Sequence, residues 1–185
     1  MADTPWTGDA CSLVEAFRSG ERSPSEELTA TLAAIDASEL NAFSFVDAER
    51  GDDDGDGTME SPVRSLVEAS RRTRGGADVY ARSVGTYTET DTIRLGAGSS
   101  LYGGFDEDWR RDRSRRIRIE AAAIGISLDG DGDRHVSAIE LTAGAAEPGR
   151  RAIGVRVADG ETVTIEDSRI VAGTAGDAVS VDAAG

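Results

Sequence analysis

From Ala77 onward, apolar and polar residues alternate in short segments that break at glycine or aspartate. Alternation with a period of two is typical of half-buried β-strands, and Gly and Asp at the breaks favour tight turns. This part of the chain therefore predicts a mainly β fold built from many short strands. The segments are "ADVYARSVGTYTETDTIRL", "SSLYGGF", "RRIRIEAAAIGISL", "VSAIELTAG", "AIGVRVADGETVTIEDSRIVAG" and "DAVSVDAAG".

Some of these segments resemble one another at a similar distance along the chain. "AIELTAG" begins at residue 138 and "SRIVAG" at 168, which is 30 residues later, and "AIGVRV" at 152 precedes "DAVSV" at 177 by 25. An imperfect repeat of this length, with several strands in each, predicts a β-solenoid whose stacked coils share one core. A β-sandwich is the alternative, because short strands with frequent turns also suit that fold.

The N-terminal part predicts two helices. Residues 10–19 place apolar side chains at helical spacing and stop before Gly20, a residue suited to a helix C-terminus. The second helix begins in "SPSEELTATLAAID", where Ser23 is the N-cap, Pro24 takes the first position and Glu26 completes a capping box. We therefore expect an N-terminal α-helical appendage.

The stretch "ERGDDDGDGTMESP", residues 49–62, is acidic and rich in glycine, and it lies between the helical and the strand-rich parts. This composition favours a flexible joint. A third helix is expected over residues 62–72, with Ser61 as its cap. The predicted organisation is an incomplete helical segment over 1–50, a linker over 51–60 and a β domain over 61–185.

The last predicted strand, in "DAVSVDAAG", stops partway through a coil. A last coil without a neighbour leaves backbone N–H and C=O groups unpaired. We therefore expect a C-terminal truncation of the β domain, or self-association through this open coil.

The chain carries 20 basic and 35 acidic residues, for a net charge of −15, and every basic residue is Arg. A negative field repels phosphate groups, so nucleic acid and anionic membranes are not expected partners. No apolar stretch reaches the length of a membrane span, and the N-terminus does not read as a secretory signal, which leaves localisation open. The single Cys11 is interpreted as a small buried side chain on the first helix.

Residues 6–49 resemble the N-terminal helices of amidase signature enzymes, which include the amidotransferase A subunits. The likeness rests on the first helix, on the turn "RSGERSPSE" into the second, and on "LNAF". It implies an amidase-family fragment, without the catalytic core. Those enzymes use a Ser-cisSer-Lys triad, and a chain without Lys cannot form it. Ser99 and Ser100, in "GAGSSLYGGF", are interpreted as turn and strand residues.

Residues 61–185 resemble right-handed parallel β-helix proteins of the pectate-lyase-like kind, found in bacterial surface and secreted chains. The likeness is carried by "ADVYARSVGTYTETDTIRLGAGSSLYGGFDEDWRRDRSRRIRI". It implies a right-handed parallel β-helix, and a helix over residues 62–72 that covers the open end of the first coil. It implies a fold and leaves the function open.

Two loops have carboxylates at the alternate positions that a hard cation such as calcium favours. In "LDGDGDRHVSAIE", Arg134 replaces the expected turn glycine, and the candidate ligands are Asp129, Asp131, Asp133 and Glu140. In "DDDGDGTME" the candidate positions are Asp52, Asp54 and Asp56, but Val63 stands where a bidentate Glu is expected. A solvated acidic loop is the alternative interpretation of both.

The segment "DWRRDRSRRIR" gathers several guanidinium groups, which bind carboxylates in a bidentate way. They could meet a uronate, or simply neutralise neighbouring aspartates; the residues are Arg110, Arg111, Arg113, Arg115 and Arg116. The lone His135 lies beside an acidic turn and is interpreted as exposed. No nucleophile elbow such as G-x-S-x-G is present to form a catalytic triad with it.

We therefore expect a non-catalytic structural or binding module that contacts a polysaccharide or a protein. The alternatives are an inactive amidase-family fragment and a calcium-dependent polysaccharide lyase. No cofactor is predicted, with calcium as the one candidate.

Overall fold

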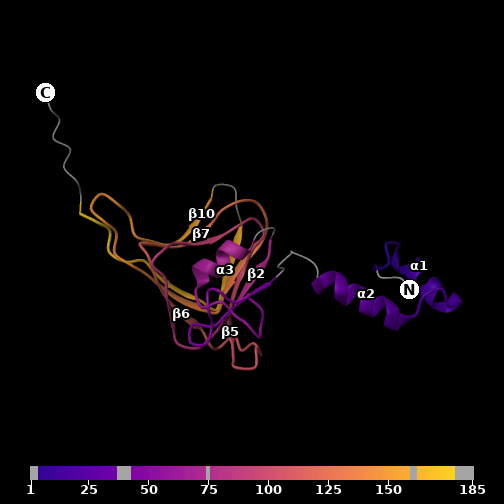
Figure 1. Cartoon of the computed structure of the whole chain (residues 1–185). Helices are drawn as coiled ribbons and strands as arrows, with labels where there is room; N and C mark the ends of the chain where they lie inside the picture. The colour runs from indigo at the N-terminus through magenta and orange to yellow at the C-terminus, as the bar shows by residue number, and fades with distance from the viewer. Residues whose placement is uncertain (1–3, 37–42, 74–75, 159–161, 178–185) are drawn as a thin grey trace. The chain divides into compact units, whose positions relative to one another are not determined.

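The computed structural model describes residues 4–36, 43–73, 76–158 and 162–177. The chain divides into two units, residues 1–40 and residues 41–185, which are considered separately (Figure 1). The two N-terminal helices belong to the first unit, and the second unit is mainly β. Within the described residues, every helix is too short or too polar to cross a membrane.

The two helices of the first unit have the predicted positions. α1 (Ala10–Ser19) ends at Gly20, whose φ of 74° is left-handed. α2 (Pro24–Asp36) begins with the predicted capping box, in which the Ser23 N–H donates to Glu26 Oε2 at 2.9 Å and the Glu26 N–H donates to Ser23 Oγ at 3.2 Å. Local sequence signals therefore set the end of α1 and the start of α2.

Cys11 is exposed, so its interpretation as a buried side chain was wrong. It stands five residues before the buried Ala16, which places it about 140° away around the helix. Several apolar side chains of these helices are also exposed, namely Val14, Leu28 and Leu32.

The second unit contains three sheets in which every strand pairing is parallel. Sheet A has the order β1 (Phe43–Val46), β2 (Asp78–Arg82), β5 (Leu101–Phe105), β8 (Arg134–Ser137) and β11 (Val163–Glu166). Sheet B consists of β12 (Arg169–Val171), β9 (Ile139–Ala143), β6 (Ile117–Ala121) and β3 (Thr86–Thr88). Sheet C consists of β10 (Ile153–Val157), β7 (Ile124–Leu128) and β4 (Ile93–Leu95).

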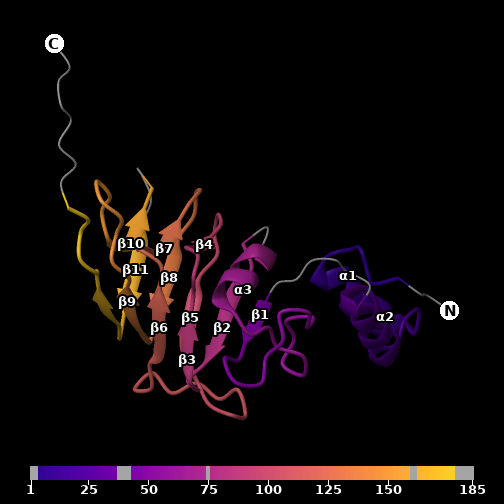
Figure 2. The ribbon, with the colours of Figure 1, turned by 60° about the vertical axis from the view of Figure 1, so that its left-hand side comes forward.

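From β2 onward, successive strands fall in sheets A, B and C in turn, and each strand pairs with the third strand after it. Figure 2 shows strands of the same sheet side by side. The repeat at residues 138 and 168 is one of these pairings, because Leu141 of β9 lies opposite Ile170 of β12. The later repeat element at 177–181 lies largely outside the described residues. The predicted mainly β, parallel-stranded architecture is confirmed.

The apolar side chains between the sheets form one core. Val79 and Leu101 enter it from sheet A, Ile119 from sheet B and Leu128 from sheet C, and each is at most 1% exposed. Tyr87 of β3 is also buried there, and its hydroxyl lies within hydrogen-bonding distance of two backbone carbonyls. The alternation predicted from the sequence thus has its apolar side facing inward.

The third helix starts later than predicted. α3 (Leu66–Arg72) is capped by Ser65, whose side chain accepts a hydrogen bond from the Glu68 N–H, so Ser61 is not its cap. α3 contacts β1, β2 and β4, the first strands of sheets A and C (Figure 2). Leu66 is fully buried in the core.

The acidic stretch predicted as a linker over 51–60 belongs to the second unit, and the division of the chain lies earlier, at residue 40. Its backbone is hydrogen-bonded on both sides: Gly57 accepts from the Phe45 N–H at 2.8 Å, and the Asp52 N–H donates to Pro62 at 3.0 Å. Gly51 leaves no space for a side chain, because a Cβ there would lie 2.2 Å from the Val63 carbonyl oxygen. Backbone pairing and close packing therefore order a segment whose composition suggests flexibility.

Candidate functional site

The outer face of sheet A carries a row of polar and aromatic side chains. Phe45 of β1 pairs with Tyr80 of β2, which pairs with Tyr102 of β5. The row continues to Ser137 of β8 and Glu166 of β11. Paired residues on adjacent parallel strands point to the same face and lie about 4.8 Å apart, so the register alone brings these side chains together.

The rings of this row pack on one another. The centroids of Tyr80 and Tyr102 are 5.7 Å apart with an interplanar angle of 28°, and Phe45 lies 5.5 Å from Tyr80. His135 of β8 stacks on Tyr102 from the other side, at 6.4 Å. Phe43 stacks on Tyr80 at 5.4 Å. The contacts form a continuous aromatic strip across four strands of sheet A.

A backbone irregularity adds Phe105 to the strip. The register of β2 and β5 shifts between Tyr80 and Arg82, where Gly104 has φ 89°. A Cβ on Gly104 would lie 2.6 Å from the Asp112 carbonyl oxygen, so only glycine fits. The Phe105 ring then meets Tyr80 edge to face, at 5.3 Å between centroids.

Arg111 fixes the following loop over the strip. Its guanidinium lies 4.9 Å from the Tyr102 ring centroid, a cation–π arrangement. Its Nη2 donates to Ser137 Oγ, and its Nε donates to the Gly103 carbonyl at 3.3 Å. These contacts place a positive charge beside the aromatic rings.

Beside the strip is a cavity of about 520 Å³, which we name the aromatic pocket. It is lined by Asp78, Tyr80, Tyr102, Phe105, Arg111, Arg113, His135, Ser137 and Glu166. Within the described part of the chain, neither the Tyr80 nor the Tyr102 hydroxyl has a hydrogen-bond partner. The pocket thus combines apolar ring surface, two phenol hydroxyls, two carboxylates and two guanidinium groups.

Burial raises the pKa of two groups in the aromatic pocket. It raises the pKa of Asp78, although hydrogen bonds from Ser100 act in the opposite direction. Burial likewise raises the pKa of the Tyr80 phenol, and the neighbouring Asp78 carboxylate adds to the effect. Tyr80 therefore remains a neutral hydrogen-bonding group at neutral pH.

The sequence had singled out three of these side chains. Arg111, Arg113 and His135 all line the aromatic pocket, and His135 is exposed as interpreted. Arg113 also pairs with Glu166 of β11 at 3.9 Å. Within the predicted solvated loop, Arg110 lies 3.9 Å from Asp108 and Arg115 lies 3.5 Å from Asp112. The tyrosines were missed, although their outward positions in "DVYAR" and "SLYGGF" follow from alternation.

The four predicted metal ligands lie on different elements. Asp129 follows β7 and is 3.6 Å from the guanidinium nitrogens of both Arg94 and Arg156, while Glu140 of β9 pairs with Arg169 at 3.0 Å. Asp131 and Asp133 are exposed in the β7–β8 loop. Among the described residues, no three His, Cys, Asp or Glu side chains are grouped to hold a metal ion. Calcium binding by Asp129, Asp131, Asp133 and Glu140 stays a prediction.

Ser99 and Ser100 occupy the predicted turn before β5. Both are buried, and Ser99 Oγ donates to the Thr73 carbonyl at 3.2 Å while Ser100 Oγ accepts from the His135 N–H at 3.1 Å. Each hydroxyl satisfies a backbone group, so Ser99 links the turn to the end of α3 and Ser100 links it to β8.

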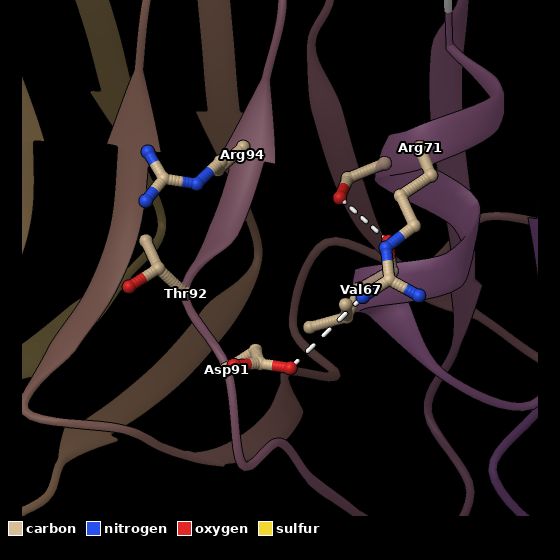
Figure 3. Close-up of a pocket in the computed structure, with 6 residues that line it drawn as sticks. Val67, Arg71, Asp91, Thr92 and Arg94 are labelled. Atoms are coloured by element: carbon tan, nitrogen blue, oxygen red, sulfur yellow. Dashed lines mark hydrogen bonds and ion pairs between the residues drawn. The ribbon is translucent and has the colours of Figure 1, made fainter.

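A second pocket of about 450 Å³ lies between α3 and the segment leading into β4 (Figure 3). Its charged groups are already paired, since Arg71 lies 4.0 Å from Asp91 and Arg94 pairs with Asp129 at 3.6 Å. No aromatic ring lines it. The aromatic pocket is therefore the stronger candidate for ligand binding.

Comparison with known proteins gave no match to a family model, to a curated protein or to a solved structure.

Proposed function

We propose that the second unit is a right-handed parallel β-helix that acts as a non-catalytic binding module, and that its aromatic pocket holds a glycan. The observation that carries this proposal is the row of Tyr80, Tyr102 and His135 on sheet A, with Arg111 fixed over it.

The strand order supports the β-helix. Each pass of the chain adds one strand to sheet A, one to sheet B and one to sheet C, and all pairings are parallel. Stacked coils of this kind share one core and leave a flat outer face on each sheet. Self-association through the open C-terminal end, in "DAVSVDAAG", is a further prediction of the sequence.

The chemistry of the aromatic pocket supports a glycan over a purely apolar ligand. A sugar ring has C–H faces that pack on aromatic surface and hydroxyls that need donors and acceptors. The pocket supplies ring surface together with the Tyr80 and Tyr102 hydroxyls as both donors and acceptors. Asp78 and Glu166 add acceptors, and Arg111 adds donors.

The composition supports binding without catalysis. The amidase likeness of residues 6–49 comes without a lysine anywhere in the chain, so the amidase triad cannot form here. A calcium-dependent lyase would depend on Asp129 and its predicted partners, and two of those carboxylates are paired with arginines.

The proposal is tested by native electrophoresis of the whole chain through gels that contain neutral or acidic polysaccharides. At least one polysaccharide is expected to retard the wild-type protein. Tyr102→Ala removes the central ring and should weaken that interaction by about tenfold or more, since a stacked ring contributes roughly 1.5 kcal/mol.

Met59→Ala is the control, because Met59 is an exposed apolar side chain of the same unit that neither belongs to the aromatic strip nor lines the aromatic pocket. It should retain most of the retardation. Equal retardation of wild type and Tyr102→Ala, with circular dichroism showing both folded, would exclude the aromatic pocket as the glycan site. A wild-type protein that no polysaccharide retards would also overturn the proposal.

A further inference from the structure

Arginines are concentrated in one short segment of this acidic chain. Residues 110–118, "RRDRSRRIR", contain six arginines and a single aspartate, whereas the whole chain has a net charge of −15. The segment connects β5 of sheet A to β6 of sheet B, so its arginines lie beside both sheets. Arg111 and Arg113 line the aromatic pocket, and the later arginines line a different one.

This second cavity, which we name the arginine pocket, has a volume of about 430 Å³ and is lined by Ser83, Gly85, Thr86, Arg115, Arg116 and Arg118. Thr86 of β3 lies opposite Arg118 of β6 in the register of sheet B. None of the residues that line the pocket is acidic. Positive charge and two hydroxyl groups therefore face the same small volume.

The charges of the arginine pocket are only partly neutralised within the described residues. Arg116 donates to the carbonyl of Asp167 at 2.6 Å, a contact with a neutral group. The Arg118 guanidinium makes no ion pair or hydrogen bond with another described residue. Glu140, its neighbour across the strands, pairs with Arg169 instead.

Four carboxylates lie near the arginine pocket. Glu120 and Glu140 line a neighbouring cavity together with Thr86 and Arg118. Asp112 is 3.5 Å from Arg115, in an exposed pair that water screens strongly. Glu49 lies beside Gly85. Among the described residues, none of the four forms an ion pair with Arg116 or Arg118, so both guanidinium charges are without a carboxylate partner.

Ser83 gives an independent indication of a ligand. Its Oγ is buried and has no hydrogen-bond partner among the described residues. A buried hydroxyl normally finds a partner, and this one lines the same cavity as three guanidinium groups. An anion with several acceptor oxygens would satisfy the hydroxyl and the guanidinium groups together.

We propose that the arginine pocket binds a tetrahedral oxyanion, the sulfate or phosphate group of a small or polymeric ligand. Arg116 and Arg118 supply charge-assisted donors, and Ser83 and Thr86 supply hydroxyl donors. Four acceptor oxygens at tetrahedral angles suit donors that come from β3, from β6 and from the loop before it, whereas a planar carboxylate presents only two. This site is separate from the aromatic pocket, and the inference does not rest on the proposed glycan binding.

The test is a titration of the whole chain with sodium sulfate, sodium phosphate or sodium acetate at constant ionic strength, followed by two-dimensional ¹H–¹⁵N spectra. We expect saturable shifts at Ser83, Thr86 and the Nε–H groups of Arg116 and Arg118. Sulfate or phosphate should bind at least about fivefold more tightly than acetate. A preference between sulfate and phosphate would identify the source of the group.

Arg118→Gln should weaken oxyanion binding by about fivefold or more, and Ser83→Ala should weaken it to a smaller extent. Arg110→Gln is the matched control, because it removes the same charge from the same segment at a position that lines neither pocket. Linear shifts without saturation would overturn the proposal. Equal losses in Arg118→Gln and Arg110→Gln would also do so, since they would indicate an unspecific effect of net charge. Tyr102→Ala should leave oxyanion binding unchanged.

Discussion

Asp47 and Arg82 form an ion pair inside the second unit, where their side chains are 1% and 5% exposed. Asp47 also accepts hydrogen bonds from the Glu49 and Arg50 N–H groups, both at 3.0 Å, and Arg82 donates to the Asp106 carbonyl at 3.0 Å. The pair therefore joins β2 to the start of the acidic stretch and to the loop after β5.

Replacing Asp47 with alanine should be strongly destabilising, because it leaves the Arg82 charge buried without its partner. The expected loss is about 3–5 kcal/mol in the free energy of unfolding, measured by urea denaturation. Arg50→Gln is the control, since the Arg50–Glu107 pair is 3.5 Å long and largely exposed. It should cost less than about 1 kcal/mol. Similar losses in the two variants would contradict this account of Asp47.

At the residue scale, the sequence was sufficient to say which side chains point outward but not which of them meet. Alternation places Tyr80 and Tyr102 on an outer face, yet their stacking depends on the register between β2 and β5. That register depends on how many residues separate consecutive strands of the sheet, and segments of unequal length hide it. Gly104 shifts it further by one residue, which local propensity alone does not predict.

At the scale of elements, a residue distant in sequence adds to the Ser65 cap of α3. Glu89, which follows β3, is 5% exposed, and its carboxylate accepts from the Leu66 N–H at 2.6 Å and the Val67 N–H at 3.3 Å. Free N–H groups at a helix start favour a negative partner. Glu89 thereby links the start of α3 to the segment that follows β3.

Glu89→Ala should destabilise the second unit by about 1–3 kcal/mol, because two buried N–H groups lose their acceptor. Hydrogen exchange of the Leu66 and Val67 amides should accelerate more than exchange in β7. Glu68→Gln, on the same helix, is the control, since its pairs with Arg71 and Arg72 are partly exposed. A Glu89→Ala protein with unchanged exchange at these two amides would show that α3 does not depend on this cap.

Burial raises the pKa of Glu89 above its ordinary value of 4.5, and the hydrogen bonds from Leu66 and Val67 only partly oppose it. A carboxyl group with a raised pKa binds its proton more tightly in the folded state, so its contribution to stability is lost as pH rises through the folded pKa. The stability of wild type relative to Glu89→Gln should therefore fall as pH rises above 4.5, in urea denaturation series. A difference independent of pH between 4.5 and 7.5 would contradict the raised pKa.

The acidic stretch is held by arginines of α3 and of the segment before it. Asp53 accepts from the Arg64 and Ser65 N–H groups at 3.0 and 2.8 Å, and Arg72 donates to the carbonyls of Asp53 and Gly55. These contacts explain why composition misled the prediction of a linker. Acidic side chains at the surface of an ordered loop and those of a flexible joint give the same sequence pattern.

Protease Asp-N should therefore cut slowly within residues 51–60 of the wild type, despite four aspartates in that range. Arg72→Gln removes the contacts to Asp53 and Gly55, and should raise the cutting rate several-fold, followed by mass spectrometry. Arg71→Gln, which keeps those contacts, is the control. Rapid cutting of the wild type would support a flexible joint. Protection that appears only with added calcium would support the calcium hypothesis for this loop.

At the scale of the whole molecule, the sequence predicted the kinds of elements in each part better than the place where the parts divide. Alternation and capping signals are local, so they identified α1, α2 and the strands. The division at residue 40 depends on β1 pairing with β2, across more than 30 residues of chain. Four residues, "FSFV", give too weak a pattern to predict such a pairing.

The position of this division gives a prediction for the two units. The core cluster of the second unit begins at Val46 and includes residues of α3. In the same unit the Phe45 N–H donates to Gly57 of the acidic stretch, and Val63 hydrogen-bonds with Phe45 and Asp47. A chain of residues 41–185 therefore contains every described contact of this core, and should unfold in one cooperative transition with a midpoint within about 2 °C of the whole chain's. A chain of residues 61–185, which follows the earlier predicted boundary, loses β1 and the partner of Arg82, so its midpoint should fall by at least about 6 °C. Thermal unfolding followed by circular dichroism distinguishes the two boundaries. Equal midpoints for both shortened chains would mean that β1 and the acidic stretch add nothing to the stability of the sheets.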